Sequence, residues 1–253
     1  MLTKAKLAAE KRLELVHVSL MRNPDFAQFS GLFMVGKTEV VDKPVTAYTN
    51  GRDARYGRAF ADSLRDKELA FLVMHENMHK CYRHLTTWRS LYEIDRGLAN
   101  AACDYVINLM LVDMDPEEEV IAFPLDPKTG KRMGLYDERF RGMDTKQVFD
   151  ILREEQEEDD GGDQGDGGDG GNGQPDNGSG SPSQGQLDEH DWDGAQELSE
   201  SEQKQLQEDI DHALRQGGIY AGKVGATMDR SISELLAPKV DWRAVLRRFI
   251  KTH

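Results

Sequence analysis

The stretch that decides the fold of this chain is Leu69-Ala-Phe-Leu-Val-Met-His-Glu-Asn-Met-His79. If it forms a helix, His75 and His79 lie one turn apart on one face, and their imidazoles can converge on a single metal ion. Glu76 lies beside this pair, where its carboxylate can reach a metal-bound water without being a ligand. A bound zinc ion lowers the pKa of such a water to about 7. The spacing H-E-x-x-H therefore predicts a zinc site with Glu76 as general base.

A third protein ligand is needed, and Asp104 is the best candidate. It belongs to the next long helix predicted along the chain, which is apolar almost all round and would bury an isolated carboxylate at high cost. Asn100, Asp104 and Asn108 share one face of that helix, a pattern typical of a ligand flanked by amides that orient the site. The alternative is a structural carboxylate that accepts hydrogen bonds or pairs with an arginine such as Arg83 or Arg89.

The other histidines are weaker candidates for metal ligands. His84 lies five residues after the motif, on the opposite side of the helix, and could bind only if the helix broke first. Residues 80–83 contain no signal for such a break. His17 is expected to be a half-buried helix residue. His190 lies among carboxylates, where it could bind a metal or plug the cleft, whereas Trp192 beside it is expected to dock the chain.

Outside the motif, the sequence predicts an α+β fold that is mainly helical. Periodic apolar residues predict helices over residues 2–21, 58–64, 66–85, 93–111, 144–158, 199–216, 228–236 and 242–250. Short β-branched runs predict strands over residues 31–35 and 45–49, and Asn50-Gly51 predicts a tight turn before the next run. This region should therefore form a small antiparallel sheet.

Residues 159–186 contain no aromatic or large aliphatic residue, so they cannot bury enough apolar surface to become ordered. We expect three parts: a catalytic domain over residues 1–158, a disordered acidic linker over 159–186, and a helical segment over 187–253 that packs on or extends the domain. The region from Glu154 to Asp211 holds 20 acidic residues and one basic residue, so it alone accounts for the negative net charge. Such a linker could lie over the cleft as a gate.

Composition restricts the remaining functions. Cys81 and Cys103 cannot form a disulfide framework and are expected to be buried thiols. The first residues lack the apolar region of a secretory signal, and no run has the roughly 20 apolar residues of a membrane span. No phosphate-binding glycine loop and no aromatic-interleaved basic stripe is present. We therefore expect a soluble cytoplasmic protein that binds neither membrane nor nucleic acid.

Several segments together carry a family resemblance: Thr46-Ala-Tyr-Thr-Asn-Gly51, Tyr56, the motif at 75–79, Ala101-Ala-Cys-Asp-Tyr-Val-Ile-Asn108, His190-Asp-Trp192 and Pro238-Lys-Val-Asp-Trp242. They resemble the metallopeptidase domain found ahead of von Willebrand factor A-like domains in bacterial and phage proteins. The resemblance implies a zincin-like fold in which a small sheet packs on the motif helix. It also implies zinc on His75, His79 and Asp104, with Glu76 catalytic. A following von Willebrand-type domain is not expected here, so an ATPase partner rests on family analogy alone.

The leading hypothesis is thus a zinc metallopeptidase that hydrolyses a peptide bond in an intracellular protein target, in the host cytoplasm if the protein is phage-encoded. Tyr105 or Tyr82 could stabilise the oxyanion, on position alone. Two alternatives stay open: a catalytically silent, metal-stabilised adaptor on the same fold, and hydrolysis of another amide or an ester.

Overall fold

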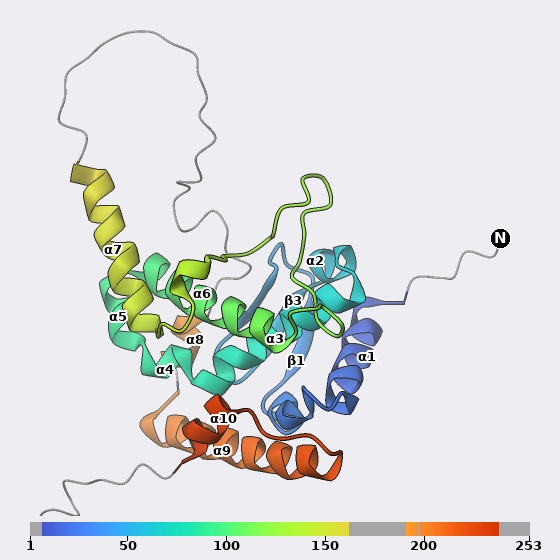
Figure 1. The fold of residues 1–253 in the computed structure, drawn as a ribbon. Helices are drawn as coiled ribbons and strands as arrows, with labels where there is room; N and C mark the ends of the chain where they lie inside the picture. The colour runs from blue at the N-terminus through green and yellow to red at the C-terminus, as the bar shows by residue number, and fades with distance from the viewer. Residues whose placement is uncertain (1–6, 162–190, 197, 238–253) are drawn as a thin grey trace, which may run out of the picture.

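The computed structural model describes residues 7–161, 191–196 and 198–237 (Figure 1). Helices dominate the described part and accompany one small sheet, so the predicted mainly helical α+β fold is confirmed. The helices are α1 Ala9–Arg22, α2 Arg58–Ser63, α3 Asp66–Tyr82, α4 His84–Thr87, α5 Arg89–Ile94, α6 Arg96–Met114, α7 Thr145–Gly161, α8 Trp192–Gln196, α9 Glu200–Lys223 and α10 Arg230–Leu236, with 3-10 turns η1 Ala27–Phe29, η2 Leu32–Met34 and η3 Glu138–Phe140. The strands are β1 Thr38–Val41, β2 Ala47–Thr49 and β3 Ala54–Gly57.

The sheet has the strand order β1-β3-β2 and is mixed. Strands β2 and β3 form the predicted antiparallel hairpin, in which Gly51 has a φ of 85° and the Asn50 side chain accepts from the backbone N–H of Asp53 at 2.7 Å. Strand β1 pairs with β3 in parallel. The fully antiparallel sheet was therefore wrong: after β1 the chain crosses to the far edge before the hairpin, which places β3 in the middle.

The strand predicted over residues 31–35 was also wrong, because this segment forms η2. Leu32 and Phe33 are buried in the core that surrounds α3. A short buried apolar run does not distinguish a strand from a helical turn by its pattern. Here the close approach of α9 decides: a Cβ on Gly31 would lie 2.1 Å from the carbonyl oxygen of Ala213.

Helix α3 is the central element, and every residue from Glu68 to Cys81 is buried. It packs against α1, β2, α6 and α9, so it has no solvent-facing side over most of its length. Figure 1 shows α3 and α6 near the middle of the molecule, with the strands behind them and α9 and α10 below. The expectation of a small sheet packed on the motif helix is met through the contact of β2 with α3.

A buried arginine joins the first helix to this centre. The Arg12 guanidinium donates to the carbonyl oxygens of Ala61 and Leu64, both at 2.7 Å, and to the Asp66 carboxylate at 2.8 and 3.0 Å. These carbonyls belong to the last turn of α2 and to the residue that follows it, where helix geometry leaves acceptors without partners. Arg12 thus fixes the junction at which α2 ends and α3 begins.

Helix α9 is longer than predicted, since it runs to Lys223, beyond the predicted end at residue 216. Packing explains this: Gly217 lies against η1, where a Cβ would be 2.0 Å from the carbonyl oxygen of Gln28. The other predicted helices agree with α2, α6, α7 and α10 within a few residues, whereas α1 begins later than predicted, at Ala9, after the non-helical residues 7 and 8. The predicted helix 242–250 and most of the predicted linker lie outside the described residues, although residues 159–161 end α7.

The division into three parts stays a prediction. Within the described residues, α9 packs closely on η1 and also touches α3. The thiols of Cys81 and Cys103 are buried, as expected, and burial raises the pKa of Cys81 to about 12. In the part of the chain that the structure describes, no helix has both the length and the apolar character that crossing a membrane requires.

Candidate metal centre

Helix α3 brings the imidazoles of His75 and His79 together. Both side chains are fully buried, and their Nε2 atoms lie 3.2 Å apart. The helix begins with a local signal: the Glu68 carboxylate accepts from the backbone N–H of Arg65 at 2.7 Å, which satisfies a donor at the helix start. The predicted spacing on one helical face thus places two nitrogen ligands side by side.

Helix α6 adds Asp104 to this pair. Its Oδ1 lies 3.7 Å from Nε2 of His75 and 3.5 Å from Nε2 of His79, and the three donor atoms lie within 4.8 Å of one another. Ligands about 2.0–2.2 Å from a tetrahedral zinc ion are roughly 3.3 Å apart. The three observed separations fit that spacing, so a small divalent ion can be held by these atoms.

Asn108 shows which nitrogen of His75 faces the centre. Its Nδ2 donates to the carbonyl oxygen of Leu135 at 2.8 Å, which fixes the orientation of the amide. Its Oδ1 lies 2.9 Å from Nδ1 of His75 and can only accept, so Nδ1 carries the proton. Nε2 of His75 therefore keeps a lone pair directed at Asp104 and His79. Such a group of lone pairs can hold a metal cation.

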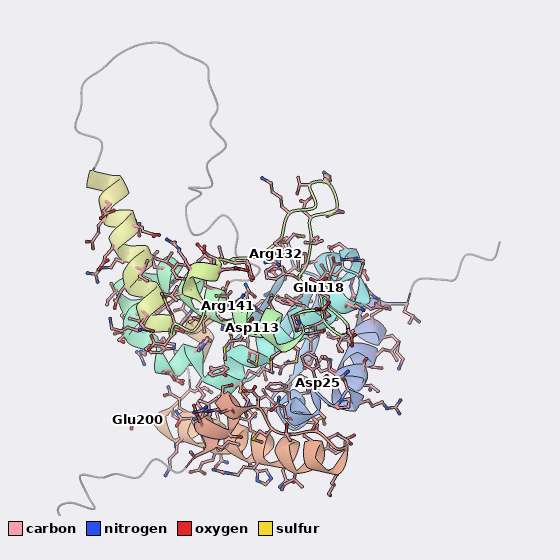
Figure 2. The ribbon with its side chains drawn as sticks, viewed as in Figure 1. Asp25, Asp113, Glu118, Arg132, Arg141 and Glu200 are labelled. Atoms are coloured by element: carbon pink, nitrogen blue, oxygen red, sulfur yellow. The ribbon has the colours of Figure 1, made fainter. Side chains whose placement is uncertain are left out.

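The segment that supplies Leu135 is tied to α6. The Arg141 guanidinium, just after η3, pairs with the Asp113 carboxylate at the end of α6, and Figure 2 shows the two side chains meeting there. This ion pair holds the chain that returns from the 115–134 region along α6. The acceptor for Asn108 is thus positioned by contacts distant in sequence.

The arginines named as alternative partners of Asp104 pair elsewhere. The Arg83 guanidinium binds the Asp211 carboxylate of α9, and Arg89 binds Glu93 at 3.0 Å. The structural ion pair weighed against the metal reading is therefore not formed with either of them. A fully buried carboxylate is stable only beside positive charge or several donors, and two imidazoles lie beside Asp104 here.

The expectation that no break occurs after the motif was wrong. Helix α3 ends at Tyr82, and Arg83 adopts the left-handed conformation with φ 54° and ψ 40°. A new helix, α4, begins after this residue, and His84 lies with its Nδ1 3.3 Å from Nδ1 of His79. His84 is buried behind His79, on the side away from Asp104. It is not among the three residues whose donor atoms meet.

Glu76 is fully buried on α3, next to the histidine pair, and its role as general base stays a prediction. Burial holds the pKa of the Tyr56 hydroxyl of β3 well above its ordinary value, and the charge of Glu76 raises this pKa further. Burial lowers the pKa of Lys80 to about 8, while the charges of Glu76 and Asp53 oppose this shift. The Lys80 ammonium donates to the carbonyl oxygen of Val35 at 3.3 Å.

The tyrosines expected near the reacting atoms face other groups. The Tyr82 hydroxyl lies 3.0 Å from Oγ of Ser231 on α10, and the Tyr105 ring packs edge-on against Phe140 at 4.8 Å. Tyr56 is a tyrosine whose pKa the charge of Glu76 raises. The sequence analysis named Tyr56 in the family resemblance but gave it no role near Glu76, because an aromatic residue in a short strand after the Asn-Gly turn also suits an ordinary core position.

A segment that follows the predicted linker in sequence packs against α5, α6 and β2. Trp192 is buried, its indole Nε1 donates to Oδ1 of Asn100 on α6, and its ring stacks on Tyr92 at 4.6 Å. The backbone N–H of Asp191 donates to the carbonyl oxygen of Thr49 on the edge strand β2 at 3.0 Å. Asn100 thus holds Trp192 instead of Asp104, one helical turn away. The predicted docking role of Trp192 fits these contacts, while His190 lies outside the described residues.

His17 lies as expected, half-buried on α1 with its Nδ1 2.8 Å from the carbonyl oxygen of Leu13.

Comparisons of the chain with curated proteins and with solved structures gave no match. A family match covers residues 20–253, and the family is described as "Putative metallopeptidase domain". This span includes His75, His79 and Asp104, the group whose geometry can hold a metal ion. The chain therefore belongs to this metallopeptidase-domain family.

Proposed function

We propose that the protein is a zinc metallopeptidase that hydrolyses a peptide bond in an intracellular protein target. The observation that carries the proposal is the meeting of His75, His79 and Asp104 donor atoms beside the buried carboxylate of Glu76. Three protein ligands leave one position of a tetrahedral ion open, which is typical of catalytic zinc, whereas structural zinc has four protein ligands. Membership in the family supports the same reading.

The roles of the residues follow from their places in the fold. A zinc ion in this site would polarise the scissile carbonyl and acidify a water molecule. His75 and His79 hold their Nε2 lone pairs toward the centre, and Asp104 offsets part of the positive charge of the ion. Glu76 accepts the proton of the attacking water and later delivers it to the leaving amine. The surrounding core excludes bulk water, which strengthens each of these electrostatic interactions.

A metal-stabilised adaptor is the second candidate, and the complete burial of the ligands favours it. His75, His79 and Asp104 are all inaccessible, so a substrate reaches them only after some part of the structure moves. A closed site of this kind also suits a metal that only supports the fold. Hydrolysis of another amide or of an ester would use the same residues.

The test combines metal content with activity. We would measure zinc per chain by elemental mass spectrometry in the wild type, His79→Ala, Asp104→Ala and Glu76→Gln, with folding checked by circular dichroism. His212→Ala serves as a control, because His212 is exposed on α9. Cleavage of a mixed fluorogenic peptide library is measured on the same samples.

The peptidase predicts about one zinc ion per chain in the wild type, the control and Glu76→Gln, with loss in the two ligand variants. It also predicts cleavage by the wild type and the control alone. If the wild type holds zinc but cleaves the library no faster than Glu76→Gln does, the result would favour the adaptor. A wild type that holds no zinc after reloading would reject both readings.

A further inference from the structure

We propose that His84 is a positioning residue for the metal ligand His79. Its Nδ1 accepts the hydrogen that Nδ1 of His79 carries, and this bond keeps the Nε2 lone pair of His79 directed at the centre. The inference rests on the proposed metal site and adds a residue that lies outside the motif.

The contact has the geometry of a side-chain pair that is built into the fold. The Nδ1 atoms of His79 and His84 lie 3.3 Å apart, at the long end of the hydrogen-bond range, and their rings are nearly perpendicular at 84° with centroids 5.1 Å apart. His84 is only 3% exposed. Water therefore does not compete for this contact, and a nitrogen buried there needs a protein partner.

The position of the metal-facing atom decides which imidazole donates. Nε2 of His79 faces Asp104 and His75, at 3.5 and 3.2 Å. A ligating nitrogen must present a lone pair, so the proton of a neutral, ligating His79 is on Nδ1. Nδ1 of His84 must then be the acceptor, which places the proton of His84 on its Nε2.

The opposite arrangement is incompatible with ligation. If His84 donated from Nδ1, a neutral His79 would carry its proton on Nε2, pointing at Nε2 of His75. His79 could no longer offer a lone pair to a cation. The tautomer of His84 is therefore coupled to the capacity of His79 to bind metal.

The backbone break at Arg83 is what delivers His84. On a continuous helix, His84 would point away from His75, as the sequence suggests. A non-glycine residue in the left-handed region is strained relative to ordinary helix geometry. Such strain persists only where the surrounding structure enforces it. Here the Arg83 side chain pairs with Asp211 of α9, and the preceding Tyr82 contacts Ser231 of α10.

His75 is held by the same kind of device. Oδ1 of Asn108 accepts from Nδ1 of His75, as Nδ1 of His84 does from His79. Partners of this sort fix the ring orientation and the tautomer of a ligating histidine, and losing one typically weakens metal binding about 10- to 100-fold. Each histidine of the motif thus has one acceptor behind it.

The experiment measures zinc affinity by competition with a chromogenic chelator, in the wild type, His84→Leu and His84→Asn. Leucine removes the acceptor, whereas the asparagine oxygen can take the place of Nδ1. We expect His84→Leu to weaken binding about 10- to 100-fold, and His84→Asn to recover most of the affinity. His212→Leu, on the exposed side of α9, should leave the affinity unchanged. The absorption spectrum of the cobalt(II)-loaded proteins should follow the same order.

A second readout uses the wild type alone, so it does not depend on whether the variants fold. Nitrogen-15 NMR of the zinc-loaded protein should show His84 neutral with its proton on Nε2. A proton on Nδ1 of His84 would overturn the proposal, and so would wild-type affinity in a folded His84→Leu. Equal losses in the leucine and asparagine variants would also reject the acceptor role. A wild type that binds no zinc would instead reject the proposed function itself.

Discussion

Asn108 joins His75 to the backbone of Leu135: its Oδ1 lies 2.9 Å from Nδ1 of the imidazole, and its Nδ2 donates to the Leu135 carbonyl oxygen at 2.8 Å. The second bond removes the choice of amide orientation that an isolated asparagine would have. The proton of His75 is therefore fixed by a residue on α6 and a carbonyl in the segment that follows it. The orientation and the protonated nitrogen of His75 therefore depend on α3, on α6 and on the segment that contains Leu135.

Separating the two bonds of Asn108 gives the first prediction. In Asn108→Leu both bonds are lost, and zinc affinity should fall about 10- to 100-fold because the His75 tautomer is no longer fixed. Asn108→Asp keeps an acceptor for His75 but leaves the Leu135 carbonyl without its donor. This variant should retain zinc while losing about 1–3 kcal/mol of stability. Chelator competition and urea unfolding measure the two effects, and equal zinc affinity in the leucine variant would contradict the prediction.

The second prediction concerns Trp192, which binds Asn100 one helical turn from Asp104. Truncating a buried tryptophan costs about 3–5 kcal/mol, and each 1.4 kcal/mol changes an opening equilibrium about tenfold. If α8 covers the site, Trp192→Ala should release bound zinc to excess EDTA at least about tenfold faster than the wild type. Trp192→Phe keeps a ring against Tyr92 and should have a smaller effect.

Phe149 supplies the control for this measurement. It is fully buried in the same apolar cluster but lies on α7, and its phenyl ring, unlike the indole of Trp192, has no donor for Asn100. Phe149→Ala should lower global stability by a similar amount, with little change in zinc release under conditions where both variants are folded. Equal acceleration in the two alanine variants would show that global unfolding, and not the local cover, controls the exchange.

Two glycines of α9 give a matched pair for the third prediction. A Cβ at Gly217 would meet the Gln28 carbonyl oxygen at 2.0 Å, whereas a Cβ at Gly222 meets nothing within 4 Å. Gly217→Ala should push α9 away from η1 and cost about 1–3 kcal/mol. Gly222→Ala should stabilise the same helix by about 0.5–1 kcal/mol, because alanine loses less conformational freedom. Urea unfolding of the two variants should therefore shift in opposite directions.

The fourth prediction follows from the lowered pKa of Lys80. Burial lowers this pKa to about 8, against an ordinary value of 10.5. Between these values the unfolded chain binds the proton that the folded protein has released, so the contribution of Lys80 to stability rises with pH across this window. Below the window, the folded state holds a charged ammonium at a cost.

Comparison with Lys80→Met isolates this effect, best in metal-free protein. The pKa of Cys81 is raised to about 12, so its contribution falls with rising pH, but it does so equally in both proteins. The wild type should therefore gain stability relative to Lys80→Met as the pH rises from about 8 to 10.5. Urea midpoints over this range measure the difference, and parallel curves would show that Lys80 does not titrate there.

The sequence predicted the parts of the site that depend on helix periodicity. The spacing of His75 and His79 placed both on one face, and an acidic residue in an apolar helix singled out Asp104. Both signals are local, because each can be recognised from one residue and its neighbours in the same helix. The long helices were predictable for the same reason, while the parallel pairing of β1 required knowledge of a crossover.

The rest depended on contacts between distant segments. Arg83 carries no signal for a left-handed residue, and its conformation is held in place beside Asp211, 128 positions later in the chain. On an unbroken helix His84 would point away from the motif, so the sequence alone did not place it beside His79. The helical state of residues 217–222 likewise follows from the fit of Gly217 against Gln28. Glycine alone suggests flexibility, and only the packing partner reverses that expectation.

The guanidinium of Arg12 also bears on where this protein can be cut. The family match begins at residue 20, inside α1, so a chain shortened to the matched residues loses Arg12 and most of its helix. The carbonyl oxygens of Ala61 and Leu64 would then need other donors, immediately before the helix that carries the histidines. The matched residues therefore leave out a side chain that joins α1 to the start of α3, and expression trials should retain the residues from Ala9 onward.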